Sequence, residues 1–567
     1  MEQNARSSEN GKAKSGDRQQ REDAATAEGA ATTTRRALLA AAAGGAAGLL
    51  LAGCTPPIGR SRAQGLDPFT LGIASGYPTP EGFVLWTRLA PEAHELFAGS
   101  AKRVSAGAAP HPLVPATLPE TVPVQWEVAE DEGMRRIVRK GSVDATAAAA
   151  HGVHVEVAGL ATNRWYWYRF SALGYRSRVG RTRTFPRERD AVSRLRLAVA
   201  SCQNIEHGYF AAYRHMVADD PDLVVHLGDY IYEGTWGQNL VRPLRLGEAQ
   251  TLADYRQRHA IYKRDPDLQE AHALFPWVMV WDDHEVANDY ADASPERILP
   301  PALFLERRAA AYQAYYEHMP MPPRMAPQGA AMRIHTSLPI GDLATLHLLD
   351  NRQYRSPQAC PMPGRGGGNA VVPSACDALR VPARSALGAE QVRWLDRRFA
   401  AADSHWNLVG QQTLMAPMLM PARSGPARVR TDGWDGYPLS RQRLLDSIVQ
   451  HRLRNPVVLG GDLHAFYAAD LHAKADDPAS AVIASEFVTT SITSQAPGED
   501  HFARVRAANP HIRLADGRRR GYLRLTLSRD RLEADLMALE DVRRPHSGIG
   551  RLAAFVAEAG RPGPQPA

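Results

Sequence analysis

The chain has 567 residues, of which 44% are hydrophobic and 23% are charged, a composition that is ordinary for a soluble globular protein. Its length favours two domains with tails over a single small domain. The formal net charge of +6 is mild for this size, and no dense Lys/Arg run with interleaved aromatic residues occurs, so no stable nucleic-acid partner is expected.

The first 53 residues are predicted to be an export leader. Residues 34–39 read Thr-Arg-Arg-Ala-Leu-Leu, a twin-arginine pattern, and the Ala/Gly/Leu run that follows is too short to span a membrane well. Twin-arginine signals direct bacterial export, so we expect the twin-arginine machinery as a partner and a periplasmic or other extracytoplasmic location. Residues 51–54 resemble a lipoprotein signal box. Cys54 is therefore a candidate for lipidation and membrane attachment, and the alternative is a plain cleaved signal with an incidental cysteine.

After a linker over residues 54–67, residues 68–187 contain strand-sized runs separated by turns. The clearest runs are Gly82–Thr87, Val122–Val128, Gly152–Val157 and Arg164–Phe170. Short strands at such spacing predict a β-sandwich of the immunoglobulin or fibronectin type. No cluster of candidate catalytic residues lies in this region.

Residues 190–540 alternate strand-like runs with longer helical patterns, which indicates an α/β domain whose sheet is buried between helices. The predicted strands are Leu195–Ala200, Leu223–Leu227, Trp277–Trp281, Leu343–Leu349, Trp406–Gly410, Val457–Leu459 and Ile483–Val488. The predicted helices are Tyr209–Val217, Leu303–Glu317, Ala389–Ala401 and Ser440–His451. A hairpin over Leu523–Leu527 and Leu532–Leu536 closes the domain. Residues 541–567 are expected to form a C-terminal tail, loose in its Gly/Pro-rich end at 560–567.

Cysteines outside the leader have two expected roles. Cys360 and Cys376 flank a Gly/Pro-rich loop and are predicted to pair in an oxidising compartment, which would stabilise the fold by about 3 kcal/mol. Cys202 directly follows the apolar run at 195–201. It is either a small buried hydrophobic residue or a metal ligand.

Potential metal ligands follow the predicted strands one after another. In open α/β sheets, ligands gather at the carboxyl ends of the strands. The residues at these ends are Cys202; Asp229 and Tyr232; Asp282, Asp283, His284 and Glu285; Asp350, with Arg352 two residues later; and Asp462 and His464. A single strand-end aspartate is often a helix cap or a turn residue. Because the carboxyl end of each of these strands carries a potential metal ligand, the set predicts a metal site.

A dinuclear centre would explain these residue types. Asp229 is the natural bridging carboxylate, the Tyr232 oxygen suits ferric iron, and a Cys202 thiolate would add charge. Two cations can lower the pKa of a bound water and clamp the oxygens of an in-line displacement at phosphorus. Phosphate-ester hydrolysis is therefore the leading reaction class.

The remaining donors suit a harder second cation and a proton donor. Asp283, Asn288 and Asp462 offer oxygen ligands of the kind that calcium or magnesium prefers, and His464 is a borderline nitrogen donor. His284 is either a general acid for the leaving group or a neutral structural histidine bonded to a neighbouring carboxylate.

These motifs together resemble those of PhoD-type alkaline phosphatases/phosphodiesterases, within the calcineurin-like metallophosphoesterases. The matching segments are Ala200–Asn204, Gly228–Glu233, Trp281–Tyr290, Leu349–Arg355, Trp434–Pro438, Gly461–His464 and Thr490–Ser494. The resemblance covers about residues 68–540 and implies a metallophosphoesterase-type layered α/β catalytic domain. The twin-arginine leader also fits this family.

The resemblance implies a site with ferric iron and calcium ions. It supports Cys202, Asp229 and Tyr232 as iron-side ligands with Asp229 bridging. By similarity to purple acid phosphatases, His464 would also face the iron and Asp462 the second metal.

The third motif leaves two alternatives open. Related enzymes have Gly-Asn-His where this chain has Asp282-Asp283-His284, so either Asp283 or Asn288 takes the role of the asparagine. Asp289 stands where the family usually has a second asparagine and adds a carboxylate near the site. Arg352 either holds a phosphate oxygen of the substrate or forms a structural salt bridge.

The sequence thus predicts an exported phosphatase with phosphomonoesterase activity, phosphodiesterase activity or both. Its substrate would be a small phosphate ester or a cell-envelope polymer. Two readings from other classes remain: an exported phosphate- or metal-binding protein without turnover, and an iron-dependent oxidase or haloperoxidase.

Overall fold

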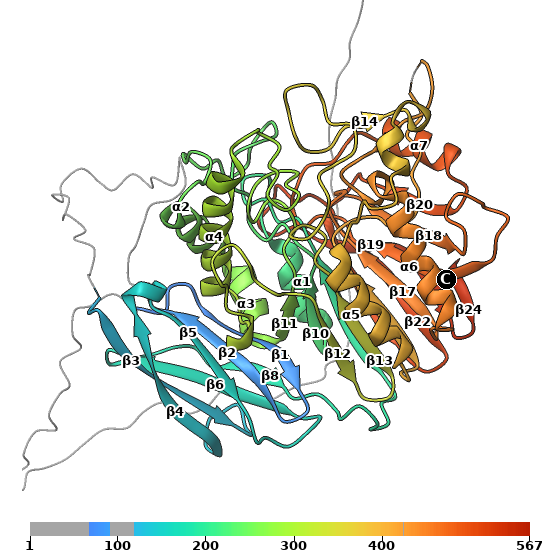
Figure 1. Ribbon diagram of the computed structural model, residues 1–567. Helices are drawn as coiled ribbons and strands as arrows, with labels where there is room; N and C mark the ends of the chain where they lie inside the picture. The colour runs from blue at the N-terminus through green and yellow to red at the C-terminus, as the bar shows by residue number, and fades with distance from the viewer. Residues whose placement is uncertain (1–66, 91–117, 423) are drawn as a thin grey trace, which may run out of the picture. The chain divides into compact units, whose positions relative to one another are not determined.

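Two large β-sheets, one of ten strands and one of seven, form the centre of the structure (Figure 1). The computed structural model describes residues 67–90, 118–422 and 424–567. The predicted leader, Cys54 and all but the last residue of the predicted linker lie outside these ranges. Within them, no helix combines the length and the apolar character needed to cross a membrane.

The ten-stranded sheet has the order β24-β23-β22-β21-β9-β10-β11-β1-β2-β5. Its strands are β1 (Ile73–Thr79), β2 (Gly82–Arg88), β5 (Gly152–Val157), β9 (Leu195–Ala200), β10 (Leu223–His226), β11 (Pro276–Met279), β21 (Gly521–Leu527), β22 (Arg531–Leu539), β23 (Ile549–Glu558) and β24 (Arg561–Pro566). β9, β10, β11 and β1 run parallel, and all other pairings are antiparallel. The parallel centre matches the predicted strands near residues 195, 223 and 277.

The seven-stranded sheet has the order β12-β13-β15-β17-β19-β18-β20. Its strands are β12 (Thr336–Ile340), β13 (Ala344–Leu348), β15 (Trp406–Gly410), β17 (Pro456–Gly460), β18 (Phe466–His472), β19 (Val482–Val488) and β20 (Ile512–Asp516). β13, β15, β17 and β19 are parallel to one another. All four were predicted from the sequence as strands.

Seven helices lie among the described residues: α1 (Ala211–Asp219), α2 (Leu252–Lys263), α3 (Pro266–Leu274), α4 (Pro301–His318), α5 (Gly388–Ala400), α6 (Pro438–Gln450) and α7 (Glu499–Ala508). The predicted helices coincide with α1, α4, α5 and α6 to within a few residues. The sequence prediction missed α2, α3 and α7; of these, α2 and α3 begin at side-chain caps formed by Thr251 and Asp265.

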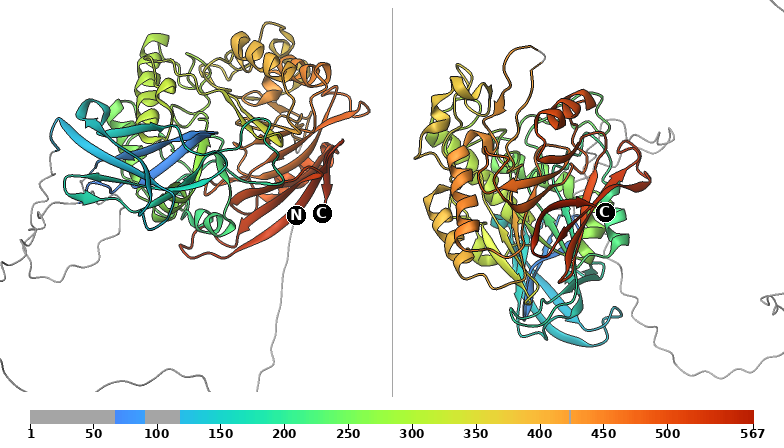
Figure 2. Two further views of the ribbon diagram at one scale, coloured as in Figure 1. Left: turned by 90° about the horizontal axis from the view of Figure 1, so that it is seen from below. Right: turned by 90° about the vertical axis from the view of Figure 1, so that its right-hand side faces the viewer.

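Side-chain alternation along the strands builds the layers. Leu408 and Leu459 of the seven-stranded sheet belong to the hydrophobic core that also contains the ten-stranded sheet and α1–α4. Their neighbours Val409 and Val458 point the other way and pack with α5 and α6. The yellow-to-orange helices at the left of the right-hand view in Figure 2 show this outer layer. Sheets between helices give an α/β fold, as predicted.

A five-stranded sheet packs near the N-terminal strands. It has the order β4-β3-β6-β7, and β8 pairs with β6. Its strands are β3 (Thr121–Ala129), β4 (Ile137–Thr146), β6 (Trp165–Ala172), β7 (Tyr175–Arg176) and β8 (Gly180–Arg183). Its apolar side chains share a core with those of β1, β2 and β5.

The predicted boundary between the two domains, near residues 187–190, does not coincide with a boundary between sheets, because strands from both sides of it belong to the ten-stranded sheet. β1 pairs in parallel with β11, with Ser75 opposite Pro276, so β1, β2 and β5 also belong to the ten-stranded sheet. An immunoglobulin- or fibronectin-type sandwich therefore stays a prediction.

The prediction of a loose C-terminal tail was wrong. β23 and β24 lie within residues 541–567 and continue the ten-stranded sheet beyond β22. β24 is the edge strand, where prolines are tolerated because an outward-facing backbone nitrogen needs no partner. The Gly563 N–H still donates to Ser485 Oγ at 3.0 Å, which ties this edge to the seven-stranded sheet.

Candidate metal centre

The predicted ligands meet where the central strands of the two sheets end. Cys202, Asp229 and Asp283 follow β9, β10 and β11, and Asp462 and His464 follow β17. Side chains at the carboxyl ends of parallel strands share one edge of a sheet. Two such edges face each other here, so residues that are far apart in sequence gather in one place.

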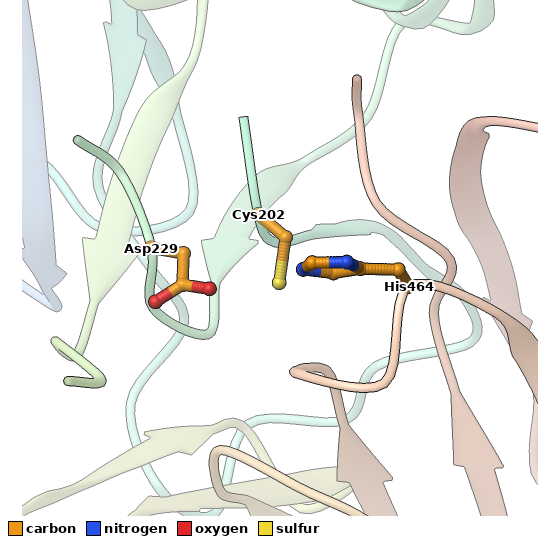
Figure 3. A group of neighbouring side chains, drawn as sticks. All are labelled: Cys202, Asp229 and His464. Carbon is orange, nitrogen blue, oxygen red and sulfur yellow. The ribbon is translucent and has the colours of Figure 1, made fainter. Parts of the chain in front are cut away.

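Two groups of ligand atoms are close enough to hold a cation. Cys202, Asp229 and His464 offer atoms that all lie within 4.8 Å of one another, as do those of Asp229, Asp283 and His284. Figure 3 shows the first group, with the thiol between the carboxylate and the imidazole. Asp229 belongs to both groups, which is the position expected of a bridging carboxylate.

The backbone at these residues has an uncommon conformation. Positive φ angles occur at Cys202 (58°), Asp229 (56°), Asp462 (63°) and His464 (54°). Each non-glycine residue in this region costs roughly 1–3 kcal/mol, and such residues cluster at functional sites. The folded chain therefore holds all four side chains in place against a local preference for other conformations.

Tyr232 joins the two iron-side candidates through its phenol oxygen. The Tyr232 hydroxyl donates to Asp229 Oδ2 at 2.9 Å and lies 3.2 Å from His464 Nε2. Ser494 Oγ donates to the same phenol oxygen at 2.7 Å, a contact that was not predicted, although Ser494 closes the Thr490–Ser494 motif. The His464 Nδ1–H donates to the Gln495 carbonyl at 2.6 Å, which leaves Nε2 as the nitrogen available to a metal.

Glu285, which the sequence placed among potential ligands, instead organises the loops. Its carboxylate accepts hydrogen bonds from the backbone N–H groups of Asp229 at 3.1 Å and Asp282 at 2.8 Å, and also from that of Tyr230. Glu285 thereby fixes the loop after β10 against the loop after β11. This brings Asp229 and Asp283 together.

The electrostatics of the site fit cations. Burial raises the pKa of the Cys202 thiol and of the Tyr232 phenol, and the nearby Asp229 carboxylate raises both further. Burial likewise raises the pKa of Asp229 itself. Asp229 Oδ1 and Asp283 Oδ1 are buried without a hydrogen-bond partner among the described residues. Because buried polar atoms are nearly always satisfied, such oxygens fit a site for metal ions.

Asp283 and Asn288 both line the cavity at this site. Asp283 Oδ2 accepts a hydrogen bond from the Asp289 backbone N–H at 2.7 Å. The Asn288 side-chain amide donates to Glu296 at 3.0 Å, so its carbonyl oxygen stays available as a ligand. The structure brings both predicted candidates to the site.

His284 contacts a glutamate that was not predicted to matter. Its Nδ1 lies 2.7 Å from Glu233 Oε2. Burial lowers the pKa of His284, but Glu233, Asp283 and Asp229 together outweigh it and raise that pKa well above its ordinary value. A protonated His284 beside the cavity can donate a proton, and the same side chain belongs to the second ligand group.

The structure does not bring Arg352 to the wall of the cavity. Arg352 is only 1% exposed and does not line the cavity. Its Nε donates to Asp282, and its Nη1 and Nη2 donate to the two oxygens of Asp432 at 2.9 Å each. The structure shows the other reading, a buried salt bridge with Asp282 and Asp432, and Arg352 Nη2 also lies 3.6 Å from Asp283 Oδ1.

A cavity of about 630 Å³ opens onto the candidate ligands. It is lined by Asp229, Glu233, Gly234, Thr235, Trp236, Glu248, Asp283, His284, Asn288, Asp289, Met418, Met420, Arg430, Asp462, Leu463, His464, Tyr467, Pro497, His501 and Phe502. The sequence missed the lining arginine, Arg430, although it lies close to the Trp434–Pro438 motif. Cys360 and Cys376, which lie in sequence between Asn288 and Arg430, form the predicted disulfide.

Comparison with known proteins gives consistent matches over both halves of the chain. The family model described as "PhoD-like phosphatase" matches residues 197–536, and the one described as "PhoD-like phosphatase, N-terminal domain" matches residues 53–186. "Alkaline phosphatase D" of Bacillus subtilis (strain 168) is 43% identical over 500 residues, which cover 86% of this chain and 80% of that protein. A solved structure described as "Structure of PhoD" matches with a TM-score of 0.80 and 40% identity, over 89% of this chain and 93% of the other.

Proposed function

This chain belongs to the PhoD-like phosphatase family, and on that premise we propose that it is a metal-dependent hydrolase of phosphate esters. The observation that carries the proposal is the position of the Asp229 carboxylate, which lies within 4.8 Å of ligand atoms of Cys202 and His464 and also within 4.8 Å of one of Asp283. A carboxylate shared in this way suits two neighbouring cations, and a cavity large enough for a phosphate ester opens onto it.

Ferric iron and calcium are the proposed cations. Cys202, Tyr232 and His464 would hold the iron together with Asp229, since thiolate, phenolate and imidazole are donors for a transition metal. Asp462, Asp283 and Asn288 would hold calcium through oxygen. When bound, the cations would lower the pKa of a water molecule and clamp the phosphoryl oxygens during displacement.

His284 is the proposed proton donor for the leaving group. Its Nδ1 is held by Glu233 at 2.7 Å, which orients the ring. A general acid must lie beside the atom that it protonates, and His284 lies on the wall of the cavity. Glu233 would keep the imidazole in place and in its charged form between turnovers.

Export and envelope location are part of the proposal. The twin-arginine pattern at residues 34–39 supports passage through the twin-arginine machinery, and Cys54 would carry a lipid that holds the protein at a membrane. The substrate would be a small phosphate ester or an envelope polymer, cleaved as a monoester, a diester or both.

Metal analysis combined with a visible spectrum tests the site. Purified protein should contain iron and calcium and should show a phenolate-to-iron charge-transfer band. Tyr232→Phe should bleach or shift this band. A parent protein without iron, or a band that is unchanged in the variant, would contradict the iron assignment.

Hydrolysis of p-nitrophenyl phosphate and of its bis-ester tests the activity. The metal-loaded protein should cleave at least one of them, and the ratio of the two rates distinguishes a phosphatase from a phosphodiesterase. If phosphate binds but neither ester is cleaved, even with added calcium, the protein is a binding protein and the proposed function is wrong.

A further inference from the structure

Arg430 is a cationic side chain on the wall of the catalytic cavity. It ends the short strand β16 (Val429–Arg430) and is the only lysine or arginine among the described residues that line the cavity. The wall also carries several carboxylates, which repel a phosphate ester wherever no cation neutralises them. A fixed positive charge at this place therefore favours an anionic ligand.

The Arg430 guanidinium is free to take a ligand. The side chain is exposed, and within residues 67–90, 118–422 and 424–567 it forms no hydrogen bond and no ion pair. Partial loss of water around the guanidinium in the cavity wall lowers its pKa, but Asp289, Asp462, Asp432 and Asp283 together outweigh this and raise it. A charged, unpaired guanidinium presents five donors in a planar fork that matches the oxygens of a phosphoryl group.

The backbone of Arg430 is held on both sides. β16 pairs with β14 (Ala370–Val371), with Ala370 opposite Arg430. One residue later, the Thr431 N–H donates to the Asn369 carbonyl at 2.9 Å. Asp432 follows and is fixed by Arg352 and other side chains. The backbone at Arg430 is thus held in place by hydrogen bonds, although it lies next to a surface hairpin.

A disulfide closes the segment that carries β14. We call residues 360–376 the strap, since Cys360 and Cys376 are bonded at its two ends. Inside the strap, the Asn369 side-chain amide donates to the Cys360 carbonyl at 2.9 Å, and the Gly368 N–H donates to Asp289 Oδ2 at 2.8 Å. Cys376 also packs against Val429 of β16. The strap therefore connects the disulfide to the strand that ends in Arg430.

We propose that Arg430 binds the phosphoryl oxygens of the substrate and that the disulfide-closed strap positions it for this contact. The proposal rests on the phosphate-ester hydrolysis proposed above. The organic group of the ester would then lie along the apolar part of the wall, formed by Met418, Met420, Tyr467 and Phe502. Arg430 takes the role that the sequence suggested for Arg352.

Steady-state kinetics of the metal-loaded, full-length protein with p-nitrophenyl phosphate test the contact. Arg430→Ala should lower kcat/KM by about 10- to 100-fold, mainly through KM, because a charge-assisted hydrogen bond is lost. Arg430→Lys should recover part of the loss, since it keeps the charge without the fork. Arg397→Ala, an exposed arginine of α5 that does not line the cavity, is the control and should behave as the parent does.

Binding of inorganic phosphate, measured by calorimetry, separates the two proposals. Arg430→Ala should weaken it about 10-fold or more in parent and variant proteins of equal metal content. If no form of the protein cleaves esters but this difference persists, the proposed function fails and the Arg430 site stands. If parent and Arg430→Ala bind phosphate equally, the Arg430 proposal is overturned whatever the activity is.

The strap is tested by a double-mutant cycle. The Cys360→Ser/Cys376→Ser variant should have a KM several-fold higher than that of the parent and a similar kcat. Thermal unfolding should show that this variant remains folded. The same pair of substitutions made in Arg430→Ala should raise KM no further, because the residue that the strap positions is already absent. A strap effect of equal size in both backgrounds would show that the disulfide does not act through Arg430.

Discussion

Replacing Arg352 by methionine should destabilise the protein strongly and leave phosphate affinity almost unchanged. Arg352, Asp282 and Asp432 are each no more than 5% exposed in their side chains. Among the residues that the structure describes, the substitution removes the only arginine that contacts Asp282, while Asp432 keeps Arg355 at 3.0 Å and Gln358 at 2.8 Å. Removing one partner of a buried ion pair typically costs about 3–5 kcal/mol. Because Asp282 would be left without its arginine, we expect the free energy of unfolding to fall by an amount in that range.

Thermal unfolding of metal-loaded protein measures this loss. A fall in Tm of roughly 5 °C is expected for a chain of this size. Arg355→Met is the matched control, because Arg352 would continue to hold Asp432 through two bonds, and its Tm should fall by less than half as much. The loss in Arg352→Met should shrink at acidic pH, where the stranded carboxylates take up protons.

A different outcome would refute the reasoning. If Arg352→Met kept the parent Tm but bound inorganic phosphate 10-fold more weakly, Arg352 would contact the substrate. The structural role inferred from its burial would then be wrong. An equal fall in Tm for the Arg352 and Arg355 variants would show that Asp432 alone, and not Asp282, depends on the arginines.

Three further predictions concern the glycine before Asp229, a buried glutamate and the metals. Gly228→Ala should abolish iron binding and lower Tm, because Gly228 has φ +109° and a Cβ there would lie 2.5 Å from Asp282 Cβ; retained iron in this variant would contradict it. Burial raises the pKa of Glu486 from 4.5 to about 7, so the folded state binds this proton more tightly and stability falls as pH rises through that window. The free energy of unfolding of Glu486→Gln should therefore rise by about 3 kcal/mol relative to that of the parent between pH 4.5 and pH 8. A difference between the two proteins that does not change with pH would contradict this prediction. Chelation should lower the parent Tm, since cations at 1,000 times Kd contribute about 4 kcal/mol, and Asp229→Asn should lose most of that response.

Local sequence patterns predicted much of the candidate metal centre because the candidate ligands closely follow strands. Apolar runs ending in Gly-Asp identified Asp229 and Asp462, and parallel strands bring such ends to one edge. Cys202 was left between two readings by its sequence context alone. Its place within 4.8 Å of Asp229 and His464 favours the ligand reading.

Properties that depend on distant partners could not be read from the sequence. Arg352 and Arg430 both lie near matching motifs, and only the tertiary structure shows that the first is buried and the second faces the cavity. The strands β2 and β5 were recognised as strands, but β1 was not, and its pairing with β11 joins residues about 200 positions apart. β24 was missed because its prolines forbid a central strand and are accepted at an edge.

The distribution of ligands over the two sheets links metal binding to folding. Cys202 and Asp229 follow strands of the ten-stranded sheet, whereas Asp462 and His464 follow β17 of the seven-stranded sheet. Neither sheet alone presents the complete iron-side set, so the site exists only after the sheets have packed through their shared core. Metal binding then stabilises the packed state selectively. A protein of this kind would acquire its cations as it folds, and this requirement is met by a route that exports folded proteins, such as the one proposed from the twin-arginine pattern.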